Sequence, residues 1–162
     1  MSNPVLDRVV RCSRFGRRLI QSAPALVNAI AFDRPFGRSA MQAFLAEPPC
    51  TDEDALNRRL RQLRQRVWLT VTARDLAGAA DVAAVTAAYT DLAEVCIAAA
   101  LDFHHAQLAA RHGEPRDEAG QAQEMVVVGM GKLGGGELNV SSAIDLIYLY
   151  AREGNTDGAK PI

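Results

Sequence analysis

Apolar residues recur at helical spacing through roughly the first two-thirds of the chain. Several helices are predicted from this pattern, over residues 5–21, 24–30, 39–46, 52–77 and 81–113. Pro24 suits a first helical turn, and Thr51 is expected to cap the fourth helix. Residues 1–120 are therefore expected to form a helical region.

The pattern changes after a polar loop that is expected over residues 113–123. Met125 to Val128 is a short apolar, mostly β-branched run, typical of a buried strand. Residues 144–150 form a second apolar run, and glycines and polar residues separate the two. We therefore predict an α+β fold, in which residues 121–162 supply the first strands of a mixed sheet.

The segment between the two predicted strands is suited to holding an anion. Gly129 and Gly131 allow a sharp turn, and residues 134–136 are three consecutive glycines. Main-chain N–H groups that are free of side chains can approach an anionic oxygen closely. Lys132 adds a mobile positive charge. A phosphate-bearing ligand is the expected partner of this glycine turn.

Asp145 is the only charged residue between Ala143 and Tyr150. A carboxylate within an apolar strand is costly to bury unless it meets a cation or good hydrogen-bond donors. Magnesium prefers one or two carboxylates together with phosphate oxygens. Asp145 is therefore a candidate Mg²⁺ ligand, and a polar step formed by Asn139, Ser141 and Ser142 precedes it.

The composition limits the compartment and the partners that we expect for the protein. The 162 residues are 49% hydrophobic and 23% charged, with three cysteines and a formal net charge of −1. We expect a cytoplasmic protein without a disulfide framework, a secretion signal or a membrane-spanning segment. Residues 1–70 carry 12 basic and 6 acidic residues, whereas residues 71–162 carry 6 and 13. A solvated helix face accounts for the basic half, and no nucleic-acid partner is expected.

The run GMGKLGGGELNVSSAIDLIYLY, residues 129–150, resembles the signature of glutamine synthetase adenylyltransferase/adenylyl-removing enzymes. LRQLRQRVWLTVTARDLAG, residues 60–78, is similar to a helical segment of that family. The resemblance implies a nucleotidyltransferase fold of the polymerase β type. It also implies transfer of AMP to a tyrosine of glutamine synthetase, or its removal by phosphorolysis, in control of nitrogen assimilation. Within the signature, the residues GGGELN resemble the adenylyl-removing half of the family protein.

The resemblance also implies cofactors, partners and roles for individual residues. Mg²⁺ would act with ATP or ADP and inorganic phosphate, on glutamine synthetase and under a PII-type signalling protein. Asp145 would hold the metal, and Gly134 and Gly135 would cradle phosphate, with Lys132 nearby. Ser141 and Ser142 would contact phosphate or fix the entry to the second strand.

One position departs from the family pattern, which has two aspartates separated by one residue on the second strand. Ala143 occupies the place of the first, and only Asp145 remains. One carboxylate bridges a pair of metal ions less well than two. We therefore expect weak or no Mg²⁺-nucleotide binding. The alternative to an enzyme is a truncated, catalytically impaired fragment of the family, or a helical interaction module.

A third hypothesis comes from GMGKLG, residues 129–134, which satisfies the G-x-G-x-x-G pattern of dinucleotide-binding proteins. That fold requires a crossover helix of a dozen or more residues before the next strand. Only about eight residues separate Gly134 from Ala143. The segment also does not match a Walker-type phosphate-binding loop, because Leu133 stands where that motif requires Ser or Thr.

Overall fold

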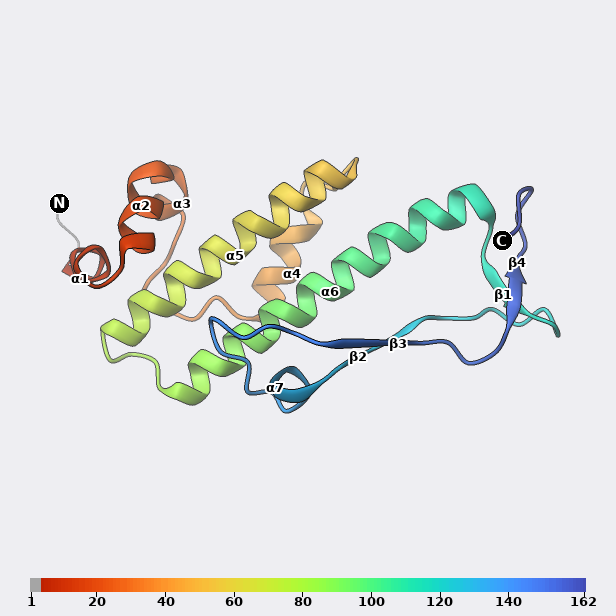
Figure 1. Cartoon of the computed structure of the whole chain (residues 1–162). Coiled ribbons are helices and arrows are strands. Elements are labelled where there is room, and N and C mark those ends of the chain that lie inside the picture. Colours follow the sequence, from red (N-terminus) through yellow and green to blue (C-terminus); the bar gives the residue numbers. More distant parts are fainter. Residues whose placement is uncertain (1–3) are drawn as a thin grey trace.

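The computed structural model describes residues 4–162 and confirms the α+β class, with a mainly helical first part followed by short strands (Figure 1). The helices of the first part are α1 (Pro4–Cys12), α2 (Arg14–Ser22), α3 (Pro24–Asn28), α4 (Arg38–Ala46), α5 (Glu53–Leu76) and α6 (Val82–His112). The remaining elements are β1 (Pro115–Asp117), β2 (Val126–Gly129), α7 (Gly131–Gly134), β3 (Leu146–Leu149) and β4 (Gly154–Thr156).

The predicted helix over residues 5–21 is wrong as a single element, because it is broken at Ser13 into α1 and α2. Ser13 has an extended backbone, and its hydroxyl accepts a hydrogen bond from the Gly16 main-chain N–H at 3.0 Å. A serine side chain that satisfies a free N–H favours a new helix start over continuation of the old helix. The two short helices can then fold back against α5.

The two long helices begin at aspartate caps. Asp52, rather than the predicted Thr51, caps α5: its side chain accepts from the Ala55 N–H at 2.7 Å. Asp81 caps α6 in the same way, through the Ala84 N–H at 2.8 Å. The predicted ends of both helices, close to Gly78 and Gly113, are confirmed.

Two hydrophobic clusters lie on different sides of α5. Leu63 and Val67 pack with α4 and α6. Leu69 and Ala73 pack with α1, α2 and the segment that follows α3. Trp68 is half-buried and packs against both clusters. α5 therefore joins the two halves of the helical part.

Within residues 4–162 one helix, α6, is long and apolar enough to cross a membrane by length and composition alone. The core helix of a soluble protein passes the same test, so this is weak evidence. Tyr89, Leu92 and Val95 on α6 are buried against α4 and α5. This packing accounts for part of the apolar surface of α6.

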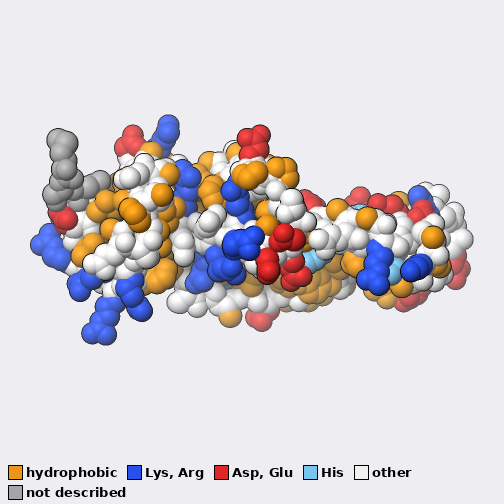
Figure 2. All heavy atoms as spheres, turned by 90° about the horizontal axis from the view of Figure 1, so that it is seen from above, with side chains coloured by type: hydrophobic (Ala, Val, Ile, Leu, Met, Phe, Trp, Pro, Cys, Tyr) orange, Lys and Arg blue, Asp and Glu red, His pale blue; other side chains and the backbone are white. Residues whose placement is uncertain are grey.

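Charge is distributed unevenly along the molecule. Seen from above, basic side chains gather mainly over the end that carries the first helices, and acidic side chains are more frequent toward the other end (Figure 2). This matches the excess of basic residues in positions 1–70 and of acidic residues in positions 71–162.

The strands form two separate antiparallel pairs. β2 pairs with β3, so that Val126 lies opposite Leu149 and Gly129 opposite Leu146. The prediction that β2 is buried is wrong: Val126 is 55% exposed and its partner Leu149 is 50% exposed. The other face of the pair carries Leu146, which packs against the helical core, and Tyr148, which is 59% exposed. The helices therefore cover this face only near Leu146.

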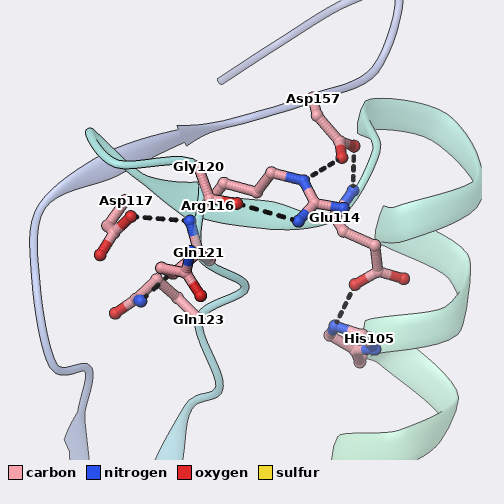
Figure 3. A network of polar contacts seen from close by, with 8 residues as sticks. All are labelled: His105, Glu114, Arg116, Asp117, Gly120, Gln121, Gln123 and Asp157. Atoms are coloured by element: carbon pink, nitrogen blue, oxygen red, sulfur yellow. Dashed lines mark hydrogen bonds and ion pairs between the residues drawn. The ribbon is translucent and has the colours of Figure 1, made fainter.

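The predicted loop over residues 113–123 contains β1, which pairs with β4 beyond the C-terminal end of α6 (Figure 1). We call this β1–β4 pair the clip, and Asp157 links its two strands (Figure 3). Its carboxylate accepts from the Arg116 guanidinium and, at 2.8 Å, from the Glu114 N–H. These hydrogen bonds from Arg116 and then Glu114 lower the pKa of Asp157 below its ordinary value of 3.8.

The clip should loosen in acid. A carboxyl whose pKa is lowered on folding stabilises the folded form above its ordinary pKa, and this stabilisation is lost as the pH falls through the lowered value. The protection factor of the Glu114 N–H, which is its hydrogen-exchange rate compared with that of an unfolded reference at the same pH, should therefore fall once the pH drops below about 3.8. The Asp157→Asn variant should exchange faster already at neutral pH, with a weaker pH dependence. Identical acid responses in the two proteins would contradict this role.

Candidate functional site

The glycine turn follows β2 and is anchored on the helical part by two leucines. Leu133 in α7 and Leu138 after it are 4% and 6% exposed, and both belong to the core cluster of α4, α5 and α6. The Leu138 N–H also donates to the hydroxyl of buried Thr90 on α6, at 3.3 Å. The backbone between these leucines is thus fixed at both ends while its glycines stay exposed.

The three consecutive glycines of the turn differ in why glycine is needed, and at one of them folding does not need it. A Cβ at Gly134 would lie 2.5 Å from the Gly129 carbonyl oxygen, so no side chain fits there. Gly136 has φ +72°, a left-handed conformation that glycine adopts without strain. A Cβ at Gly135 would meet nothing closer than 3.5 Å, and its φ is −83°. Folding therefore does not require glycine at position 135, where a role in binding can be tested separately.

Asn139 organises the polar step, a role that the sequence analysis did not assign. Its Oδ1 accepts from the hydroxyls of Ser142 and Ser141, at 2.9 and 3.4 Å, and from the Ser141 N–H at 3.2 Å. Asparagine side chains commonly fold back onto the backbone two residues on, so the signal was present in the sequence. Of the two roles predicted for the serines, this geometry favours fixing the strand entry.

Loss of the Asn139 side chain should therefore loosen the segment that leads to Asp145. Asn139→Ala leaves two hydroxyls and one N–H without their acceptor, which should cost about 1–2 kcal/mol of the free energy of unfolding. Asn139→Asp keeps the accepting oxygen and should lose less. Urea denaturation of the two variants measures the difference, and equal stabilities would contradict the assignment.

Asp145 lies next to the glycine turn. Its carbonyl accepts from the N–H of Met130 at 2.9 Å, one step beyond the β2–β3 ladder. Side chains alternate across a strand, so Asp145 shares the exposed face with Ile147, opposite to Leu146. Asp145 is exposed, so the cost of burying its carboxylate does not arise. Within residues 4–162 its carboxylate has no hydrogen-bond or ion-pair partner, and so it is available to a ligand.

The acidic residues present suit one ion better than two. Within the described part of the chain, no three His, Cys, Asp or Glu side chains are grouped closely enough to hold a metal. Asp145 is the one carboxylate in residues 139–150, which lead into and form β3, and Ala143 is exposed two residues earlier. One carboxylate suffices for Mg²⁺ when phosphate oxygens complete the shell. Lys132 is exposed on α7, where it is accessible to an anion.

The dinucleotide-binding hypothesis is wrong. β2 and β3 are antiparallel neighbours, whereas that fold requires parallel strands. The helix between them, α7, has only 4 residues and cannot serve as a crossover. The glycines therefore form a tight turn between two paired strands.

Residues 5–162 match the family model described as Glutamate-ammonia ligase adenylyltransferase. Proteins named "Bifunctional glutamine synthetase adenylyltransferase/adenylyl-removing enzyme" are 45% identical in Thioalkalivibrio sulfidiphilus, 42% in Nitrosomonas eutropha and 48% in Burkholderia mallei. These alignments cover 97%, 98% and 90% of this chain, but only 17%, 18% and 16% of the relatives. The chain therefore spans about a sixth of the relatives' length, and it belongs to the glutamate-ammonia ligase adenylyltransferase family.

Proposed function

We propose that this chain forms the front part of a nucleotidyltransferase unit that moves AMP to or from a tyrosine of glutamine synthetase. Residues 1–120 would be its helical region and residues 121–162 an incomplete catalytic core. The observation that carries the proposal is the junction of the exposed glycine turn with Asp145, through the hydrogen bond between Met130 and Asp145. The relatives' printed names supply the reaction and the protein substrate.

Binding of the nucleotide would use both sides of this junction. The N–H groups of Gly134 and Gly135 donate to the carbonyl oxygens of Met130 and Gly131, so these glycines would serve by leaving the turn free of side chains, where phosphate oxygens could approach. The Lys132 ammonium would be the mobile partner of the phosphate. Asp145 would hold one Mg²⁺ together with the nucleotide's phosphates. When bound, the ion neutralises charge on the phosphoryl group that is transferred. Asn139 would position this carboxylate by fixing the step that contains Ser141 and Ser142.

We infer the direction of the reaction from the resemblance of the signature to the adenylyl-removing half of the family protein. Inorganic phosphate would attack the adenylyl phosphorus, the bond to the tyrosine oxygen would break, and ADP would leave. The protein partners would be glutamine synthetase and a PII-type signalling protein, and the setting cytoplasmic. With Ala143 in place of the first aspartate, the chain would be an impaired form of such a unit.

A chimera tests this proposal. This chain would replace the matching segment of the Thioalkalivibrio sulfidiphilus relative and would carry Ala143→Asp, so that a low starting rate does not hide the effect. Loss of an outer-shell group commonly costs a metal site 10–100-fold, so Asp145→Asn should lower ADP release from adenylylated glutamine synthetase at least about 100-fold. Asp102→Asn, at an exposed acid on α6, is the matched control. Equal rates in the two variants would refute the assignment.

A second candidate function is a helical interaction module without catalysis. The observation that favours it is the lack, within residues 4–162, of a group of three metal-ligating side chains, beside a helical platform with two hydrophobic clusters. In that case, Asp145→Asn would leave the affinity of the chimera for glutamine synthetase unchanged. The chimera would release no ADP, with or without this substitution.

A further inference from the structure

Five of the six arginines of α5 fall into two groups, and the sixth, Arg58, is exposed outside the groove described below. Arg59, Arg66 and Arg74 donate hydrogen bonds to main-chain carbonyl oxygens of neighbouring segments, at 2.7 to 3.5 Å. Arg61 and Arg64 make no hydrogen bond or ion pair within residues 4–162. The first group fastens the helices together. The second, three residues apart on one face of the helix, is free to bind something else.

Both free arginines line a groove of about 400 Å³ between α5, α6 and the segment that leads from the glycine turn to β3. α5 also contributes Trp68, α6 contributes Tyr89, and the polar step contributes Ser142. A neighbouring hollow of about 280 Å³ is lined by the same two arginines and by Trp68. The groove is of the size that small ligands occupy in proteins.

The groove carries positive charge without a balancing negative charge. No Asp or Glu is among its lining residues in the described part of the chain. Burial raises the pKa of Tyr89 to about 12, although the nearby positive charge of Arg64 opposes this, and burial raises the pKa of Cys96 to about 11. Both groups are therefore neutral at physiological pH. The two guanidinium groups thus define the electrostatic character of the groove.

We propose that this groove binds the phosphate group of a small phosphorylated ligand, with Arg61 and Arg64 as the phosphate-binding residues. Guanidinium groups match phosphate oxygens with paired hydrogen bonds. Apolar or planar parts of the ligand would pack against Trp68 and Leu92, which also line the groove. Asp145 and the glycines of the turn are outside this lining, whereas Asn139 and Ser142 of the polar step belong to it. The phosphate site at Arg61 and Arg64 therefore adjoins the glycine turn without sharing its carboxylate, and it goes beyond the function proposed above.

The single tryptophan of the chain makes the proposal measurable, because Trp68 lines the groove and reports on its contents. AMP, inorganic phosphate and adenosine would be titrated at constant ionic strength, without divalent metal, while Trp68 fluorescence is followed. The choice of AMP rests on the proposed function, whereas the groove does not. AMP should give a saturable change at a lower concentration than phosphate, and adenosine should bind most weakly. Adenosine that binds as tightly as AMP would overturn the proposal.

Matched variants identify the residues. Arg61→Gln with Arg64→Gln should weaken AMP binding at least about tenfold, as expected for lost hydrogen bonds to a charged group. The control, Arg58→Gln with Arg111→Gln, removes the same charge at exposed positions outside the groove and should bind AMP like the unchanged chain. Equal affinities in the two double variants would overturn the proposal. Circular dichroism checks folding, and Arg61→Lys with Arg64→Lys should retain part of the affinity.

Asp145→Asn separates this site from the one at the glycine turn. Metal-free AMP binding should be unchanged in that variant, because its carboxylate is outside the groove. A loss equal to that of the double glutamine variant would show a single site and overturn the proposal. Failure of the adenylyl-transfer chimera with retained metal-free AMP binding would instead refute only the catalytic proposal.

Discussion

Ala143→Asp should raise the affinity of the chain for Mg²⁺-ADP at least about tenfold, which is 1.4 kcal/mol. The substitution restores a second carboxylate two residues before Asp145, in an exposed segment beside the glycine turn. Magnesium accepts one or two carboxylates together with phosphate oxygens, so the added ligand strengthens a site that is now held by one. Titration calorimetry measures the gain.

Two further variants make the result specific. Ala83→Asp adds the same charge at an exposed position in the first turn of α6, where a helix tolerates it, and should produce no gain. Asp145→Asn combined with Ala143→Asp should abolish most of the gain. An improvement that persists in this combination, or that Ala83→Asp reproduces, would show that general charge is responsible and would count against the metal site.

Leu133→Ala should destabilise the chain by about 2–5 kcal/mol, the usual cost of removing a buried leucine side chain. Leu133 is 4% exposed and inserts from α7 into the cluster formed by α4, α5 and α6. The loss should therefore also release the glycine turn, which this side chain anchors. Urea denaturation measures the stability, and hydrogen exchange of the Gly135 N–H, which donates to the Gly131 carbonyl oxygen at 2.9 Å, measures the release.

Leu108→Ala is the control for this prediction. Leu108 is 53% exposed on α6, so its truncation should change the free energy of unfolding by no more than about 0.5 kcal/mol. Leu133→Met conserves volume and should cost less than about 1.5 kcal/mol. If Leu133→Ala were as stable as Leu108→Ala, the glycine turn would not depend on the helical platform.

The helical part was largely predictable because its signals are local. The recurring apolar residues and the glycines at 78 and 113 indicated α5 and α6 to within a few residues. The break at Ser13 was missed, because apolar spacing continues through it and only the cap geometry separates the helices. The second buried face of α5, with Leu69 and Ala73, depends on where α1 and α2 pack, which periodicity within one helix does not report.

The candidate site was predictable in its position but less so in its arrangement. The two strands on either side of the glycines, and Asp145 at the second strand, followed from the order of residue types. The antiparallel pairing of the two strands was not predicted, and a mixed sheet was expected in its place. The exposure of β2 did not, because a β-branched run indicates what a strand can pack against, not whether a layer covers it. The difference between Arg61 and Arg59 is also set by packing alone: one lines a groove and the other binds a carbonyl oxygen.

The central claim is that an ion sits between the glycine turn and Asp145, and paramagnetic mapping tests it most directly. Manganese suits the same oxygen ligands as magnesium and broadens nearby NMR signals. In the Ala143→Asp variant, Mn²⁺-ADP should broaden the amide signals of residues 129–136 and 143–145 first, and Asp145→Asn should remove this effect. Broadening centred instead on the acidic pair Asp91 and Glu94 of α6, which contacts Arg38, would contradict the account.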